Sequence, residues 1–435
     1  MEKQIIPTEL EWTKCKVFQS VDACFCQVNK RHLQYQVRLD MEQLAGQSLE
    51  YLSATAKQNA LIGAGVCILA LLLSRVSGLC MTGRPDDELT VDALYVYPVK
   101  GLRGCSLDKA RVGEFGFEGD RTFCLQKVKR DPETKSVNFE TMFIGYTLRL
   151  ALFATYLEKQ DGRDTVVVTW NHKDSTARLS WAGSENQIRF PLRPGLNDLQ
   201  PITVNMHGSP TQAYDMGDDF ATFFSLHLEC EVRLVYIGQY SRAVLGSLAP
   251  HSQAALSKAS WSTRVLARVP FVGRPAERIV FNDIGQYLVV TKESNDQVTS
   301  RLAEGQEMDV TKFRPNVVVS GSPGAFAEDF WAELTFGGGL KMALTANCYR
   351  CQSITVDYAT GKACEDDRGQ VWKKLNKDRR VDKGAKYSPV FGRYGFCRDG
   401  DRGREISIGT KVFVTKKNPA HTVFDWPNLT SFGTS

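Results

Sequence analysis

The apolar positions of this chain fall into many short runs divided by glycine, proline and aspartate. Short runs rich in Val, Ile, Tyr and Phe between such residues are typical of β-strands. We expect strands at residues 94–99, 121–126, 165–170, 188–190, 202–206, 231–237, 278–281, 287–291, 316–320, 340–344 and 405–415. Many short strands with few helices favour a closed or nearly closed barrel, so the predicted fold class is β-rich α+β.

Helical patterns are fewer. Residues 218–227 begin with two aspartates, which suit the first turn of a helix, and residues 294–303 and 370–376 are also predicted helices. Residues 238–275 are rich in Ser, Ala and Arg, and we expect them to form a long, lid-like surface excursion.

One segment has the composition of a membrane span. The 17 residues between Lys57 and Arg75 carry no charge, which is the short end of the roughly 17–25 residues that a spanning helix needs. We predict a transmembrane anchor over residues 57–81, with Arg75 extending toward the interface. A buried core helix is the alternative for so short a run. Residues 1–54 show no period and form a poorly specified N-terminal extension.

Composition narrows the functional classes. The net charge of the 435 residues is +5, without the concentrated basic patch that a nucleic-acid partner requires, so we expect none. The 12 cysteines are scattered without regular spacing. This pattern indicates reduced thiols in a compartment that faces the cytosol, not a disulfide framework.

The strongest chemical motif is the pair Cys348-x2-Cys351, which encloses Arg350 and follows an apolar run. Thiolates bind soft metals, and Arg binds anions in a planar, bidentate way. A structural zinc site is one alternative, although downstream only Cys364 and Cys397 could complete it and they form no second pair. A redox dithiol and ordinary buried thiols are the others.

Further candidates stand beside glycines or at the start of strands. Lys100 precedes Gly101, and Arg121 follows a turn at 116–120. Arg314 and Asn316 open a strand, where side chains at a barrel mouth converge, and Tyr394 lies in an aromatic, glycine-rich loop at 387–394. Cations beside backbone amides favour anions. Together with the thiols, these residues predict a site for a metal carried on an anionic organic cofactor. No nucleophile elbow, P-loop or dinucleotide fingerprint occurs.

The motifs at residues 97–100, 119–121, 313–321, 348–357 and 388–394 resemble, in this order, those of the MOSC superfamily. The strongest likeness is to the eukaryotic mitochondrial amidoxime-reducing components, and it covers roughly residues 89–416. The resemblance implies an N-terminal MOSC-associated α/β domain at 87–228, a MOSC β-barrel domain at 229–418 and a tail at 419–435.

The resemblance also implies the cofactor Mo-molybdopterin, with Cys351 as the metal ligand and catalytic residue. The implied cofactor-binding residues are Lys100, Gly101, Arg121, Ile284, Gly285, Arg314, Asn316, Tyr349, Arg350 and Tyr394. The family has Ser at the position of Gly101 and a Thr-Ser pair at Ile284-Gly285, so these hydroxyl contacts are lost and only backbone contacts can remain there.

The implied activity is reduction of small N-hydroxylated substrates, such as amidoximes and hydroxylamines, with two electrons and two protons. The implied electron donors are cytochrome b5 and NADH-cytochrome b5 reductase, and the implied location is the mitochondrial outer membrane, facing the cytosol. One alternative is a molybdenum-cofactor carrier or sulfur-transfer module related to the C-terminal domain of molybdenum cofactor sulfurase. Another is a membrane-tethered adaptor with an inactive cofactor site.

Overall fold

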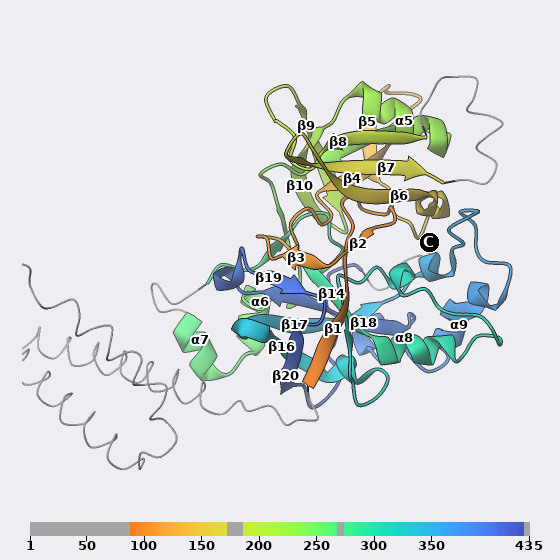
Figure 1. The fold of residues 1–435 in the computed structure, drawn as a ribbon. Coiled ribbons are helices and arrows are strands. Elements are labelled where there is room, and N and C mark those ends of the chain that lie inside the picture. The colour runs from red at the N-terminus through yellow and green to blue at the C-terminus, as the bar shows by residue number, and fades with distance from the viewer. Residues whose placement is uncertain (1–87, 172–185, 268–273, 430–435) are drawn as a thin grey trace, which may run out of the picture. The chain divides into compact units, whose positions relative to one another are not determined.

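Seven strands close a barrel in the computed structural model, which describes residues 88–171, 186–267 and 274–429 (Figure 1). All of these residues belong to one compact unit of the chain, residues 83–435. In order around the barrel the strands are β15 (Val317–Ser320), β14 (Tyr287–Thr291), β18 (Val390–Cys397), β17 (Leu340–Tyr349), β16 (Trp331–Phe336), β20 (Lys411–Lys417) and β1 (Glu88–Val96).

Strand β1 completes the barrel because it pairs on both sides. Its first residues pair with β20, and residues from Thr90 to Leu94 pair antiparallel with β15. Its last residues continue onto β2 (Cys105–Leu107). Only β14 and β15 run parallel within the barrel. Apolar residues of these strands, including Leu94, Val289 and Leu334, are fully buried and form one core cluster. The predicted barrel is therefore confirmed.

A second β-region precedes most of the barrel in sequence. One sheet has the order β5 (Val137–Thr141), β4 (Phe123–Arg130), β11 (Val232–Tyr236), β10 (Ser209–Asp215) and β9 (Gln200–Met206). The other contains β6 (Phe153–Gln160), β7 (Arg163–Trp170) and β8 (Gln187–Pro191). Helix α5 (Asp218–Leu228) buries Phe224 in their common core, near Phe153.

This region corrects the predicted α/β character of the N-terminal domain. Every pairing in its two sheets is antiparallel. Antiparallel strands are joined by turns and short loops, so they need no crossover helices. Within the described residues, α5 and the 3₁₀ turn η2 (Leu148–Leu152) are the helical elements of these sheets.

The remaining elements are short. Two pairs of strands join β3 (Lys109–Arg111) to β19 (Glu405–Ser407) and β12 (Arg242–Ala243) to β13 (Arg278–Ile279). The predicted helices are present as α8 (Lys292–Thr299) and α9 (Val371–Asn376). The expected excursion at 238–275 carries β12, α6 (Gln253–Lys258) and α7 (Trp261–Ala267) in its described part.

The prediction of an aromatic, glycine-rich loop at 387–394 is wrong for its second half, which forms part of β18. All eight residues of β18 are buried. Gly392 has a φ of +81°, and a Cβ there would lie 2.7 Å from Cγ1 of Val290. A Cβ on Gly395 would lie 2.8 Å from Sδ of Met342. The glycines therefore allow β14 and β17 to approach this strand, and they do not mark a turn.

The predicted location at the mitochondrial outer membrane is also corrected. Among the described residues, no helix is long and apolar enough to cross a membrane. The longest α-helix in that part of the chain, α5, has 11 residues and so spans about 16 Å, against a hydrocarbon core of about 30 Å. The segment 57–81, on which the anchor was predicted, lies outside the described residues.

Candidate functional site

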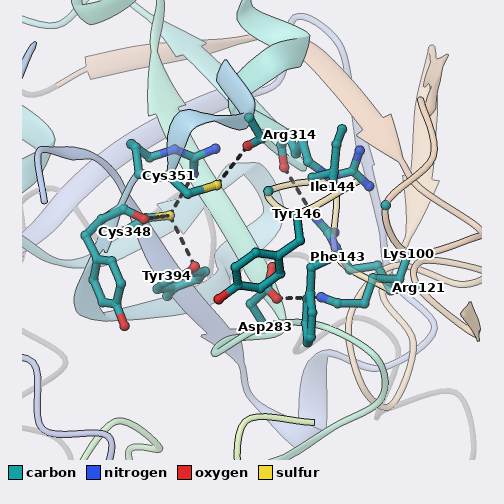
Figure 2. Close-up of a pocket in the computed structure, with 15 residues that line it drawn as sticks. Lys100, Arg121, Phe143, Ile144, Tyr146, Asp283, Arg314, Cys348, Cys351 and Tyr394 are labelled. Carbon is teal, nitrogen blue, oxygen red and sulfur yellow. Dashed lines mark hydrogen bonds and ion pairs between the residues drawn. The ribbon is translucent and has the colours of Figure 1, made fainter. Parts of the chain in front are cut away.

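Most of the predicted site residues converge on one cleft with about 700 Å³ of space, part of it open to solvent (Figure 2). It lies where the end of β17 faces the loops that follow β1 and β5. Its lining includes these predicted residues: Lys100, Gly101, Arg121, Arg314, Tyr349, Arg350, Cys351 and Tyr394. Gly285 and Asn316 line an adjoining pocket of about 340 Å³, which shares Arg121 and Arg314 with the cleft. Ile284 lines neither pocket and is buried in a second hydrophobic cluster, separate from the one that contains Leu94 and Val289.

The two thiols have different surroundings. Cys348, near the end of β17, is buried, and its Sγ accepts a hydrogen bond from Nη1 of Arg350 at 2.7 Å. A second hydrogen bond of 3.1 Å joins it to Oη of Tyr394. Burial raises the pKa of the Cys348 thiol, although Arg350 acts in the opposite direction. Cys351 is partly exposed, and its Sγ lies 3.0 Å from Oγ of Ser353. Cys351 is therefore the thiol with room for an added ligand.

The structure bears on one alternative for the thiol pair, the structural zinc site. Cys348 and Cys351 form no disulfide. Across residues 88–171, 186–267 and 274–429, no group of three or more His, Cys, Asp and Glu side chains is placed to bind a metal ion. A site built entirely from protein ligands, such as structural zinc, would need one.

Arg350 is held firmly by its neighbours. Its Nη2 donates to the carbonyl of Phe313 at 2.8 Å, and its own carbonyl accepts from Nε1 of Trp372 on α9 at 2.7 Å. The side chain is buried, yet Nε has no hydrogen-bond partner among the described residues. A buried N–H donor without a partner costs about 1–3 kcal/mol, so this atom favours an acceptor in the cleft.

Arg314 also has a buried N–H donor without a partner in the described residues. It ends the 3₁₀ turn η3 (Val310–Phe313) in the left-handed region, with a φ of +57°. Its Nη1 donates to the carbonyl of Leu102 at 2.6 Å, and its guanidinium lies 4.4 Å from the ring centroid of Tyr97. Its Nη2 is buried and has no partner within the described part of the chain. Burial, together with the nearby Arg121, lowers the pKa of Arg314.

The other two cations are already neutralised. Nζ of Lys100 lies 2.5 Å from Oδ1 of Asp283, and Nη1 of Arg121 lies 2.5 Å from Oδ2 of Asp120. Burial lowers the pKa of Lys100 to about 8. Burial alone would raise the pKa of Asp283, but Lys100 and His207 hold it well below its usual range. No carboxylate in the described residues forms an ion pair with Arg314 or Arg350, so these two supply the uncompensated positive charge of the cleft.

Asn316 acts on the site through Arg121. Its Oδ1 accepts from Nη1 of Arg121 at 3.0 Å and from the backbone N–H of Leu288 at 3.1 Å. Its Nδ2 donates to the carbonyl of Tyr95 at 3.2 Å. Its amide is thus used within the protein, and Asn316 positions the arginine. Gly285 is required by packing, since a Cβ there would lie 2.8 Å from Cβ of Tyr394.

Several lining residues were not predicted. Asp283 lines both pockets, and the turn at 143–146 lines the cleft opposite Cys351. A Cβ on Gly145 would lie 3.2 Å from Sγ of Cys351. The signal for the turn was the apolar sequence Phe143-Ile144-Gly145-Tyr146 between two strands, where polar residues are usual.

Comparisons with known proteins place the chain among its relatives. Residues 88–231 match the family described as MOSC N-terminal beta barrel domain, and residues 276–413 match the MOSC domain. Mitochondrial amidoxime-reducing component 1 of Mus musculus is 27% identical over 70% of this chain and 77% of its own length. The protein of the same name from Homo sapiens is 26% identical over 75% and 82%. Molybdenum cofactor sulfurase of Bos taurus is 31% identical over 78% of this chain but only 34% of its own length.

Proposed function

The chain belongs to the MOSC-domain proteins, and from this premise we propose that it binds a molybdenum–pterin cofactor in the cleft and reduces N-hydroxylated compounds there. The observation that carries the proposal is the convergence of a partly exposed thiol with two arginines that lack carboxylate partners in the described residues. The names of the amidoxime-reducing relatives support the choice of substrate.

The residues of the cleft fit such a group. Cys351 offers a thiolate to a soft metal, and Nη2 of Arg314 and Nε of Arg350 are buried donors that await acceptors. The anionic part of such a cofactor would supply hydrogen-bond acceptors and offset positive charge in the cleft. When bound, the cofactor would supply two-electron redox chemistry at a molybdenum ion.

The protein's own residues would orient the cofactor and supply a proton to the substrate. Arg314 and Arg350 would hold its anionic part, and Cys351 would fix the metal beside the turn at 143–146. Reduction of an N–OH group consumes two protons. Nζ of Lys100 holds a proton at the cleft wall, and its pKa of about 8 is near the pH of the cell, which suits proton transfer to a substrate oxygen.

The proposal includes the predicted electron donors, cytochrome b5 and its NADH-dependent reductase. A second candidate is a cofactor carrier or sulfur-transfer module, supported by the 31% identity to molybdenum cofactor sulfurase over 34% of that protein's length. Such a module would bind the cofactor through the same residues but would not turn over N-hydroxylated substrates.

The test is to purify the full chain, measure its molybdenum and pterin content, and assay benzamidoxime reduction with NADH, cytochrome b5 and the reductase. We expect near-stoichiometric molybdenum and steady turnover, and we expect the Cys351→Ser variant to lose reduction while it keeps its fold. Cys348→Ser is the matched control, with a smaller effect. Cofactor without turnover would support the carrier, and protein free of molybdenum after expression in a cofactor-producing host would contradict both.

A further inference from the structure

The turn Phe143-Ile144-Gly145-Tyr146 is the wall of the cleft opposite the thiols (Figure 2). It follows β5, outside the barrel, and all four residues line the cleft. Backbone N–H groups of Tyr146 and Thr147 both donate to the carbonyl of Phe143 at 3.0 Å, so the turn is tightly closed. Gly145 faces Sγ of Cys351 closely enough to leave little room for a side chain. The turn therefore stands next to the predicted reacting centre.

The two aromatic rings of the turn differ in freedom. Phe143 is fixed, because its ring stacks on His207 at a centroid distance of 4.7 Å and faces Nζ of Lys100 at 5.4 Å. Tyr146 is 63% exposed although it lines the cleft, and its described ring contact is an edge-to-face one with Phe143 at 6.2 Å. Across the cleft, Tyr394 is buried and its hydroxyl is engaged by Cys348. Tyr349, the remaining aromatic residue of the lining, is buried as well, so Tyr146 has the most exposed ring of the cleft.

We propose that the turn at 143–146 selects the substrate and that the ring of Tyr146 stacks on flat, conjugated N-hydroxylated compounds. An aromatic amidoxime would lie between this ring and the side of the cleft formed by Cys348 and Cys351, with its N–OH group toward Cys351. A small aliphatic amidoxime would reach the same centre without that contact. This inference rests on the proposed function and adds the substrate class to it.

Aromatic pairs of suitable geometry add a contact worth about three- to tenfold in binding. Removing the ring of Tyr146 should therefore lower kcat/KM for benzamidoxime by about that factor and leave kcat/KM for acetamidoxime nearly unchanged. A phenylalanine at this position should keep the preference, because the stacking surface is the ring and no hydrogen bond to the tyrosine hydroxyl is present in the described residues.

The experiment compares the full chain with Tyr146→Ala, Tyr146→Phe and the control Tyr156→Ala, a half-exposed tyrosine on β6 that does not line the cleft. The ratio of the two kcat/KM values is measured for each protein, and benzamidine binding is measured by titration calorimetry. A ratio lowered only in Tyr146→Ala, with benzamidine binding weakened in proportion, is the expected result. An unchanged ratio in Tyr146→Ala overturns the inference.

The calorimetric arm separates the two hypotheses. If the full chain reduces neither amidoxime, the proposed function fails. Weaker benzamidine binding in Tyr146→Ala than in Tyr156→Ala would then still support the turn as an aromatic-binding wall, whereas equal binding in the two variants would overturn it.

Discussion

Replacing Arg314 by glutamine tests whether the cleft is built for an anionic cofactor. The side chain has one atom committed to the protein, Nη1, and one buried donor without a partner in the described residues, Nη2. Glutamine removes the charge and the second donor, and because its side chain is shorter it also gives up the hydrogen bond to the carbonyl of Leu102. The thermal unfolding curve therefore reports the effect on the loop at 100–104 separately from the effect on the anion.

The expected loss of cofactor affinity follows from the hydrogen bond to the anion that the variant cannot form. A hydrogen bond to a charged group contributes about 1.5–3 kcal/mol, which is about 10- to 150-fold in affinity. Burial and Arg121 lower the pKa of Arg314, which shows that its charge is poorly compensated before an anion binds. We expect the upper part of that range, because the anion would also relieve this repulsion.

The assay is molybdenum and pterin content after dialysis against cofactor-free buffer, beside a thermal unfolding curve for each protein. Arg398→Gln is the matched control: Arg398 pairs with Glu333 on the barrel and does not line the cleft. We expect the content of Arg314→Gln to fall at least tenfold and that of the control to stay constant. Unchanged content in Arg314→Gln, with a normal melting temperature, would refute the assignment of this arginine to the cofactor.

Two further predictions concern charges that are already paired or buried. Lys100→Met removes the ion-pair partner of the Asp283 carboxylate at the cleft, so it should lower the cofactor content several-fold. Adding Asp283→Asn to the same chain should restore part of that content. Equal losses of cofactor in the single and double variants would argue against this coupling. Glu328 is fully buried, and burial raises its pKa from 4.5 to about 7, so the native state binds the proton more tightly than the unfolded chain. Its contribution is therefore complete below pH 4.5 and is lost as the pH rises to about 7, by up to about 3 kcal/mol. Urea unfolding of the full chain and of Glu328→Gln at pH 5 and 7.5 checks this, and parallel pH dependences in the two proteins would count against it.

The sequence predicted the barrel better than the lining of its mouth. Apolar runs such as 287–291 and 340–344 carry their strand signal locally, and both form barrel strands. Strand β18 was missed because its glycines are needed for the close approach of the neighbouring strands. In the sequence alone, glycines required by such packing cannot be distinguished from glycines that form a turn. Asp283 and the turn at 143–146 were missed for a related reason: their importance comes from distance to Lys100 and Cys351, which no local pattern encodes.

Because β1 pairs with both β15 and β20, the barrel is built from two parts of the chain that are far apart in sequence. Leu94 pairs with Val317, more than 200 positions later, so the second β-region is an insertion between one barrel strand and the rest. During synthesis, β1 leaves the ribosome first and remains an open edge until β20 has followed. A fragment limited to the matched MOSC domain, residues 276–413, would lack β1 and most of β20, and it would expose the edges of β15 and β16. Such edges promote aggregation, so the two matched domains are one unit of folding and should be expressed together.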